Sequence, residues 1–264
     1  MIRSILRIVA ILLLSFSVSH EASAAETLIS HRLEPETLHY KVMYKWGLIN
    51  KQAGTATITL SHTTEGYHAT VTAASAPWAD KLYCVRDTLI GRMTYPGFAP
   101  LYYEKIAHEG SEQKHDVVRY THYDNGLVVA QCSRKEWKKG EQKVDEQQTL
   151  ETDDTVVDIL ASFYYMRSLP YDSWKAGHQV GLDIFSGKQK ERLTINYKGI
   201  EEVTIGEMSR RTYHITFTFT SRGGKKSSDD MDAWIAADDT RIPLRLEGKL
   251  PIGSVHCILT GAKN

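Results

Sequence analysis

The sequence has few of the features that usually reveal a chemical activity. It contains no Gly-x-Ser-x-Gly turn for a nucleophilic serine and no glycine-rich loop that could hold phosphates. Its eleven histidines do not fall into a metal-binding spacing. His115 and His122 are seven residues apart, so on one strand they face opposite sides and cannot share an ion. These absences favour a non-enzymatic protein without a metal or cofactor.

Excess charge of one sign is also missing. Lys and Arg together number 32 and Asp and Glu together number 32, so the formal net charge is zero. A neutral chain has no global field to attract nucleic acid or an anionic membrane. The basic run 134–139 includes Glu136 and Trp137 and is followed by Glu141, which is typical of a solvated hairpin tip. We therefore expect no nucleic-acid partner.

Cysteines are few, and their number is odd. Cys84, Cys132 and Cys257 allow at most one pair within the chain. Cys257 alternates with Val255 and Leu259 on a predicted apolar strand face, which favours a buried free thiol there. Cys84 and Cys132 remain as the candidate disulfide pair.

Only one long hydrophobic run is present, and it lies at the N-terminus. Arg3 and Arg7 precede the apolar run Ile8–Phe16, and Ala22-Ser23-Ala24 follows it. This order is typical of a cleavable secretory signal, with an uncleaved anchor as the alternative. We predict a signal peptide over 1–24, an N-terminal extension over 25–37 and a single domain over 38–264. The protein would then be periplasmic or otherwise exported, with no transmembrane span after cleavage.

Most of the remaining chain alternates between apolar and polar residues. The alternation and the intervening turns predict about fourteen strands, too many for one flat sheet: Leu38–Tyr44, Gly54–Leu60, Tyr67–Ala74, Tyr83–Thr94, Leu101–His108, His115–His122, Leu127–Trp137, Lys143–Leu150, Val180–Ile184, Leu193–Tyr197, Thr212–Thr220, Met231–Ala237, Ile242–Leu250 and Ser254–Thr260. A loop is expected at Pro77-Trp78, and a hairpin tip at 222–226. The predicted fold is mainly β, a large curved antiparallel sheet or a partly open β-barrel.

One stretch has helical spacing and is expected to organise the fold. A helix is predicted at about 154–168, capped by Asp153 or Asp154 and stopped by Pro170. Its apolar side would pack on the sheet, with Ser162 and Tyr165 on the other side. The predicted packing residues are Val156, Ile159, Leu160, Phe163 and Tyr164.

The same stretch holds the densest acidic cluster. Asp153, Asp154 and Asp158 could serve as functional acids, either as an acid and base pair or as ligands of a hard cation. The competing interpretation is that first-turn acids cap the helix and stabilise its dipole, and we favour it. A further candidate, His214, lies among threonines on a predicted wet face, where a solvated imidazole is expected.

Three segments in order resemble one family, an exported bacterial domain of unknown function catalogued as DUF3108. They are Tyr44–Ile49 followed by Ala53–Ala56; Asp158–Arg167, similar to the family's central helix; and Trp234-Ile235 with Asp239–Leu244 and Pro251–Val255. The resemblance implies a curved, partly closed β-sheet with a helix against it, and it brings no catalytic residue. The closing hairpin also resembles that of periplasmic lipoprotein carriers, a likeness of fold alone.

These observations favour an exported envelope protein that binds a hydrophobic or glycan-like ligand, or an envelope protein partner, on a curved sheet. The first alternative is an exported hydrolase of envelope glycan or lipid that uses Asp153, Asp154 or Asp158. The second is a structural component of an envelope assembly.

Overall fold

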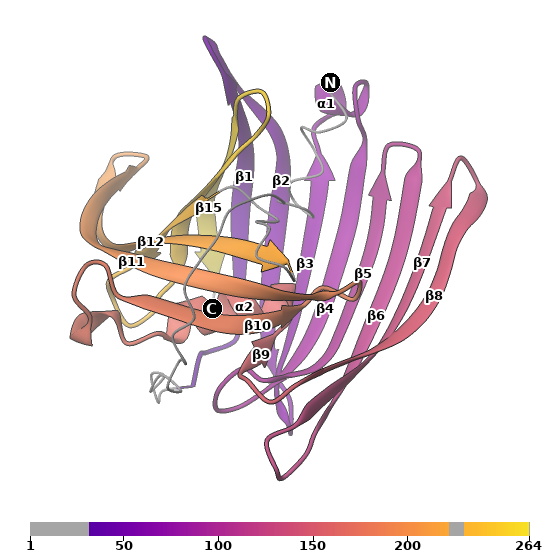
Figure 1. The fold of residues 1–264 in the computed structure, drawn as a ribbon. Coiled ribbons are helices and arrows are strands. Elements are labelled where there is room, and N and C mark those ends of the chain that lie inside the picture. Colours follow the sequence, from indigo (N-terminus) through magenta and orange to yellow (C-terminus); the bar gives the residue numbers. More distant parts are fainter. Residues whose placement is uncertain (1–31, 222–229, 264) are drawn as a thin grey trace.

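Alternation of buried and exposed side chains continues from strand to strand and builds one sheet (Figure 1). The computed structural model describes residues 32–221 and 230–263, so the predicted signal peptide and the hairpin tip at 222–226 lie outside the described residues. The strands are β1 (Glu36–Trp46), β2 (Ile49–His62), β3 (Gly66–Ser75), β4 (Val85–Thr94), β5 (Pro100–Glu109), β6 (Glu112–His122), β7 (Val128–Lys138), β8 (Glu141–Thr152), β9 (Val156–Val157), β10 (Gln179–Phe185), β11 (Lys190–Ile205), β12 (Met208–Ser221), β13 (Met231–Ala236), β14 (Pro243–Lys249) and β15 (Ser254–Lys263).

The sheet grows in two wings from β1. One wing runs from β2 to β8, and the other runs from β15 down to β9, so the strand order is β8-β7-β6-β5-β4-β3-β2-β1-β15-β14-β13-β12-β11-β10-β9. Neighbouring strands are antiparallel except β9 and β10, which pair in parallel. The predicted mainly β fold with a large curved sheet is confirmed. The short strand β9 is an addition that the alternation did not predict.

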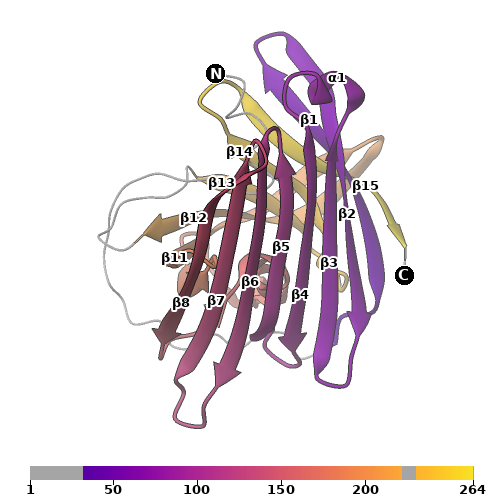
Figure 2. The ribbon, with the colours of Figure 1, turned by 90° about the vertical axis from the view of Figure 1, so that its right-hand side faces the viewer.

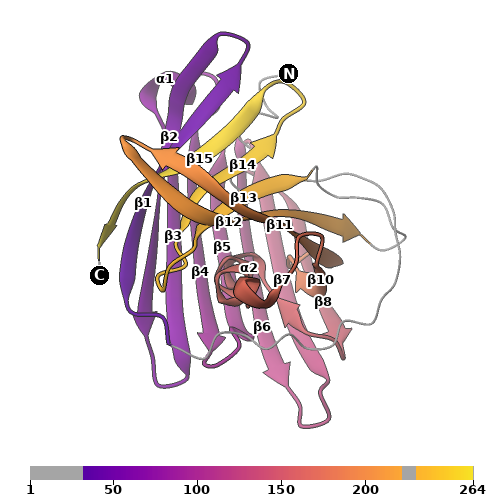
Figure 3. The same cartoon turned by 90° about the vertical axis from the view of Figure 1, so that its left-hand side faces the viewer.

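The two wings curl toward each other until their edges approach, which gives a nearly closed barrel shape (Figures 2 and 3). The edge strands β8 and β9 are consecutive in the chain, with Thr152 and Val156 at the turn between them. The hydroxyl of Thr152 donates to Asp183 on β10 at 2.6 Å, and the Gln148 amide donates to the Gly187 carbonyl at 2.9 Å. The two edges of the sheet are therefore joined by side-chain hydrogen bonds instead of backbone strand pairing.

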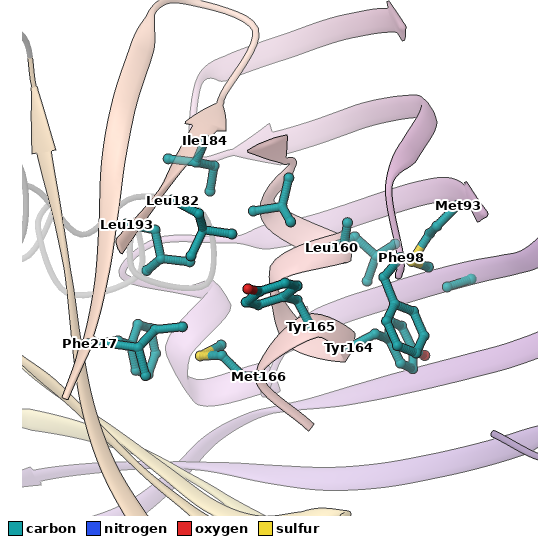
Figure 4. Close-up of a cluster of buried hydrophobic side chains, with 14 of the residues drawn as sticks. Met93, Phe98, Leu160, Tyr164, Tyr165, Met166, Leu182, Ile184, Leu193 and Phe217 are labelled. Atoms are coloured by element: carbon teal, nitrogen blue, oxygen red, sulfur yellow. The ribbon is translucent and has the colours of Figure 1, made fainter. Parts of the chain in front are cut away.

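Helix α2 (Ile159–Ser168) lies inside the curl (Figure 3). We call the sheet face that is turned toward α2 the inner face. Gly91 on β4 lies directly beneath Leu160, since a Cβ at Gly91 would be 3.1 Å from a Leu160 methyl group. The helix presents Leu160, Tyr164, Tyr165 and Met166 to both wings (Figure 4). Their partners are Met93 and Phe98 from one wing and Leu182, Ile184, Leu193 and Phe217 from the other.

The predicted start of this helix is wrong by about one turn. Val156 and Val157 form β9, and Asp158 is the capping residue, accepting from the N–H groups of Leu160 and Ala161 at 2.7 Å each. Pairing of β9 with β10 keeps the two valines extended, so the helix cannot begin before them. Neither Asp153 nor Asp154 caps it.

The predicted polar side of the helix is wrong as well. Ser162 and Tyr165 are buried, because both wings of the sheet surround the helix. Ser162 returns its hydroxyl to the Ile159 carbonyl at 2.8 Å, which satisfies the group without water. Only Ile159 and Phe163 of α2 are partly exposed, so the predicted wet side is buried.

Arg167 anchors the end of the helix and is almost fully buried. Its guanidinium forms an ion pair with both carboxylate oxygens of Glu36 at the start of β1. It also donates to the carbonyls of Arg241 at 3.0 Å and Thr240 at 2.9 Å, in the turn before β14. Asp158 and Arg167, nine residues apart, thus have different partners, as their opposite sides of the helix predict.

The candidate disulfide between Cys84 and Cys132 is absent, and all three cysteines are free thiols. Cys84 directly precedes β4, whereas Cys132 lies on β7, three strands away. Neighbouring strands are about 4.8 Å apart, and a disulfide needs Cα atoms within about 7 Å. The expected loop at Pro77-Trp78 is instead the short helix α1 (Pro77–Asp80). A 3₁₀ turn, Tyr171–Ser173, follows α2.

Within 32–221 and 230–263, no helix combines the length and the apolar character needed to cross a bilayer.

Candidate functional site

The three candidate acids do not gather in a common cleft. Asp153 is exposed. Asp154 forms an ion pair with Arg192 and accepts from the N–H of Thr155 at 2.7 Å. Asp158 is fully buried at the start of α2. Each acid thus has its own surroundings, and two of them stabilise the local backbone.

Asp158 is the one acid of the three with an unusual environment. Its Oδ1 accepts both helix N–H groups, but its Oδ2 has no hydrogen-bond partner in the described part of the chain. Burial raises the pKa of Asp158 to about 7, against the opposing effect of the two N–H groups. Burial raises the pKa values of the Tyr103 and Tyr120 phenols, and the negative charge of the Asp158 carboxylate raises them further. A carboxyl with this pKa is protonated in part of the molecules at neutral pH.

A second buried polar region lies farther along the same inner face. We call it the inner charged patch and define it by seven side chains: Asp87, Lys105, Glu109, Lys114, Asp116, Arg134 and Glu136. They come from β4 to β7, on the same side of the sheet as Gly91 and Tyr103. Two cross-strand rows carry the patch, Lys105–Asp116–Arg134 and Lys114–Glu136. The inner face therefore changes from apolar beside α2 to charged beyond it.

Ion pairs connect most of the patch. Glu109 is only 1% exposed and pairs with Lys114 at 3.1 Å and with Lys105 at 3.7 Å. Arg134 pairs with Glu136 and lies 4.0 Å from Asp116. Even so, Asp87 Oδ2, Glu109 Oε1 and Asp116 Oδ1 are buried and accept no hydrogen bond from the described residues. Three buried oxygens therefore lack a hydrogen bond, although Glu109 Oε1 lies 3.7 Å from the Lys105 ammonium and Asp116 Oδ1 lies 4.0 Å from the Arg134 guanidinium.

The electrostatics of the patch follow from its burial. Burial and, as the second cause, the nearby Glu109 carboxylate raise the pKa of Asp87 to about 6. Burial also raises the pKa of Asp116 and lowers the pKa of Lys105. Both directions favour the neutral forms, so the patch would gain from a polar group that solvates its charges.

His214 on the outer face is not the solvated residue that its threonine neighbours predict. Its ring stacks on Trp234 with centroids 4.6 Å apart, and its nitrogens lie 2.8 Å from carboxylates of Glu201 and Asp232. Burial lowers its pKa, but the hydrogen bonds to Asp232 and Glu201 outweigh it, so the pKa of His214 is raised. The carboxylates come from β11 and β13, and sequence spacing alone could not place them beside it.

Three residues on β14 and β15 have the order of a nucleophile, a base and an acid. Ser254 and His256 share a hydrogen bond of 2.7 Å at Nε2, and the Glu247 carboxylate contacts Nδ1. Burial and the cations Lys45 and Arg245 lower the pKa of His256 to about 4. An imidazole with so low a pKa is a weak base at neutral pH.

A surface depression of about 320 Å³ lies on the outer face of β2 to β5. Thr55, Thr57, Thr72 and Thr88 line it together with Arg86. Arg86 is already paired with Asp80 at 2.8 Å. Nor do the described residues include a group of three or more His, Cys, Asp or Glu that could hold a metal ion.

Sequence comparison supplies the family. The profile described as a protein of unknown function, DUF3108, matches residues 39–260, which is most of the chain. The chain belongs to the DUF3108 family. This confirms the resemblance seen in the three segments. No curated protein sequence matches the DUF3108 chain.

A solved structure supports the fold of this DUF3108 chain. The crystal structure of a β-barrel-like protein of domain of unknown function DUF1849, from Brucella abortus, superposes with a TM-score of 0.62. The match covers 88% of this chain and 98% of the other, at 10% sequence identity. At that identity the likeness extends to the fold alone.

The inner charged patch of this DUF3108 protein was missed by motif reasoning. Its signal was present in the sequence, since charged residues occupy alternate positions at Lys105, Glu109, Lys114 and Asp116 in the phase of the buried Tyr103 and Val118. A charge in the phase of a buried face is uncommon and points to a site. The apolar phase of each strand therefore identifies the inward-facing charges, but not which of them meet across the sheet.

Proposed function

We propose that this is an exported, non-enzymatic envelope protein that binds a glycan-like ligand at the inner charged patch. Export rests on the N-terminal order of Arg3 and Arg7, the apolar run and the small residues Ala22-Ser23-Ala24. Ligand binding rests on the patch itself.

The proposal rests on three buried carboxylate oxygens, one each on Asp87, Glu109 and Asp116, that accept no hydrogen bond from the described residues. Leaving a buried carboxylate oxygen without a donor costs about 1–3 kcal/mol or more. Sugar hydroxyls are donors and acceptors at once, so they would satisfy these oxygens and also accept from Lys105 and Lys114. A ligand rich in hydroxyl groups suits such a mixed surface better than a simple ion of either charge.

A purely hydrophobic ligand has less support. The apolar part of the inner face is already covered by α2, with Leu160 and Tyr164 buried against β4 and its neighbours. The hydrolase alternative also has less support, because Asp154 and Asp158 are engaged by Arg192 and by backbone N–H groups. The structural alternative predicts exposed apolar surface, and Trp46, Leu48 and Ile49 provide some at the turn between β1 and β2.

The test begins with protein recovered from the periplasm of its own cells. Native mass spectrometry should show a co-purifying carbohydrate, and titration calorimetry with envelope-derived oligosaccharides should show binding. The double substitution Glu109→Gln and Asp116→Asn keeps the shape of the patch and removes two of its charges. We expect it to weaken binding about tenfold or more.

The matched control is Glu207→Gln, an exposed glutamate in the turn between β11 and β12. It should bind as the unaltered protein does. Equal affinity for the patch variant and the control, or the absence of any carbohydrate signal, would refute ligand binding at the patch.

A further inference from the structure

The turn between β1 and β2 exposes an unusual amount of apolar surface. Trp46 is 55% exposed, Leu48 is fully exposed and Ile49 is 45% exposed. Eight large hydrophobic residues are exposed in the described ranges, and three of them lie within these four consecutive positions. We call Trp46–Ile49 the hairpin tip. Such a cluster on a water-facing turn usually marks an interaction site.

The backbone holds these side chains out in a fixed position. β1 and β2 remain paired up to Trp46 and Ile49, so the loop has only two residues, Gly47 and Leu48. Gly47 adopts φ +54°, the left-handed conformation that a tight hairpin turn requires. A Cβ at Gly47 would meet nothing within 4 Å, so the tip projects into open space (Figure 1).

Neighbouring elements brace the base of the tip. The Trp78 indole of α1 donates to the Gln52 carbonyl at 2.7 Å, and the Lys51 ammonium lies 4.4 Å from the Trp78 ring centre. On the other side, the Tyr44 hydroxyl donates to the Ile252 carbonyl at 3.2 Å, in the turn between β14 and β15. Contacts with α1 and with the turn between β14 and β15 therefore hold the base of the tip in place.

The charge around the tip has one sign. No acidic residue occurs between Glu36 and Glu65, whereas Lys45 directly precedes the tip and Lys51 follows it by two residues. The bracing segments add the exposed Lys81 and Lys249. The acid of α1, Asp80, is paired with Arg86. Although the chain has no net charge, four lysines lie in the tip's flanking and bracing segments, next to its apolar side chains.

We propose that the hairpin tip inserts into the interfacial region of an anionic phospholipid bilayer, with the four lysines contacting lipid phosphates. Exposed Trp and aliphatic side chains partition into that region, and each lysine near an anionic surface adds attraction. A protein partner is less favoured, because a stable protein interface buries upwards of about 1,000 Å², and a narrow two-residue turn offers far less. The proposal is independent of the inner charged patch.

The experiment is flotation of the purified protein with phosphatidylglycerol–phosphatidylcholine vesicles. We expect Leu48→Ser to lower the partition coefficient about tenfold, because one leucine side chain is withdrawn from the bilayer. Lys45→Gln with Lys51→Gln should reduce binding to the anionic vesicles, as should added salt. Brominated lipid should quench the fluorescence of the unaltered protein more than that of Trp46→Phe.

Met208→Ser is the matched control, since Met208 is 64% exposed in a different turn. It should bind as the unaltered protein does. All variants carry the same N-terminus, so their differences report on the tip. Equal flotation of Leu48→Ser and the unaltered protein would overturn the proposal. So would equal binding to vesicles of phosphatidylcholine alone, or recovery of the tip with a protein partner and no affinity for vesicles.

Discussion

At the scale of single residues, Asp158 makes stability depend on pH in an unusual direction. Its pKa is about 7 in the folded protein and near 3.8 when unfolded. Between these values the native state holds a proton that the unfolded state has lost. The unfolding free energy therefore falls as pH rises from about 4 to about 7, by up to roughly 4 kcal/mol for this one group.

Asp158→Asn should remove that dependence. The amide oxygen can still accept from Leu160 and Ala161, and the side chain never ionises. We expect the variant to gain stability relative to the unaltered protein between pH 5 and 8, measured by urea unfolding at both values. Parallel pH profiles for the two proteins would show that Asp158 is already ionised in the core. The exposed Asp153→Asn serves as the control and should leave the profile unchanged.

At the scale of the helix, packing against β4 carries a direct prediction. Leu160 is buried over Gly91, so Leu160→Ala should cost about 2–5 kcal/mol of unfolding free energy. Gly91→Ala should also destabilise, because its new Cβ would lie 3.1 Å from Leu160. In the double variant the smaller side chain at position 160 makes room for the new methyl group. The double variant should therefore lose less unfolding free energy than the two single variants lose together. An unchanged melting temperature in Leu160→Ala would show that α2 is not packed as described.

The helix also shows what local sequence can and cannot define. Its existence, its end before Pro170 and its main packing residues Leu160 and Tyr164 follow from spacing alone. Its start does not, because Val156 and Val157 are drawn into β9 by a partner strand more than twenty residues later. Burial of Ser162 and Tyr165 likewise depends on the second wing, which local periodicity does not contain.

At the scale of the whole molecule, alternation predicted a curved sheet but not its strand order or its closure. Which residues of a strand face inward depends on the local sequence. The hydrogen bond between Thr152 and Asp183 depends instead on the curvature of the whole fifteen-stranded sheet. The inner charged patch has the same origin. Lys105, Asp116 and Arg134 become one site only once β5, β6 and β7 are in register. Motifs within a single segment could not reveal a site assembled across strands.

Closure itself can be tested at Asp183, where β10 meets the end of β8. Its carboxylate accepts from Thr152 at 2.6 Å and pairs with Lys190 at 2.6 Å and Arg192 at 3.2 Å. Burial opposes its ionisation, but the bonds from Lys190 and Thr152 prevail and lower the pKa of Asp183. The ionised form therefore joins the two edges at neutral pH, and its contribution is lost as pH falls below about 4.

Asp183→Asn removes the charge while keeping the size of the side chain. Lys190 then loses this carboxylate, whereas Arg192 keeps its ion pair with Asp154. Because both cations are partly exposed, we expect a loss of about 2 kcal/mol in unfolding free energy. Hydrogen exchange should accelerate in β8 and β9, the two edges, and remain slow in the central strands β1 and β2. Asp145→Asn on β8 is the control, because Asp145 is exposed and lies 4.0 Å from Lys135. Uniform acceleration across all strands would mean that Asp183 supports global stability rather than closure of the sheet.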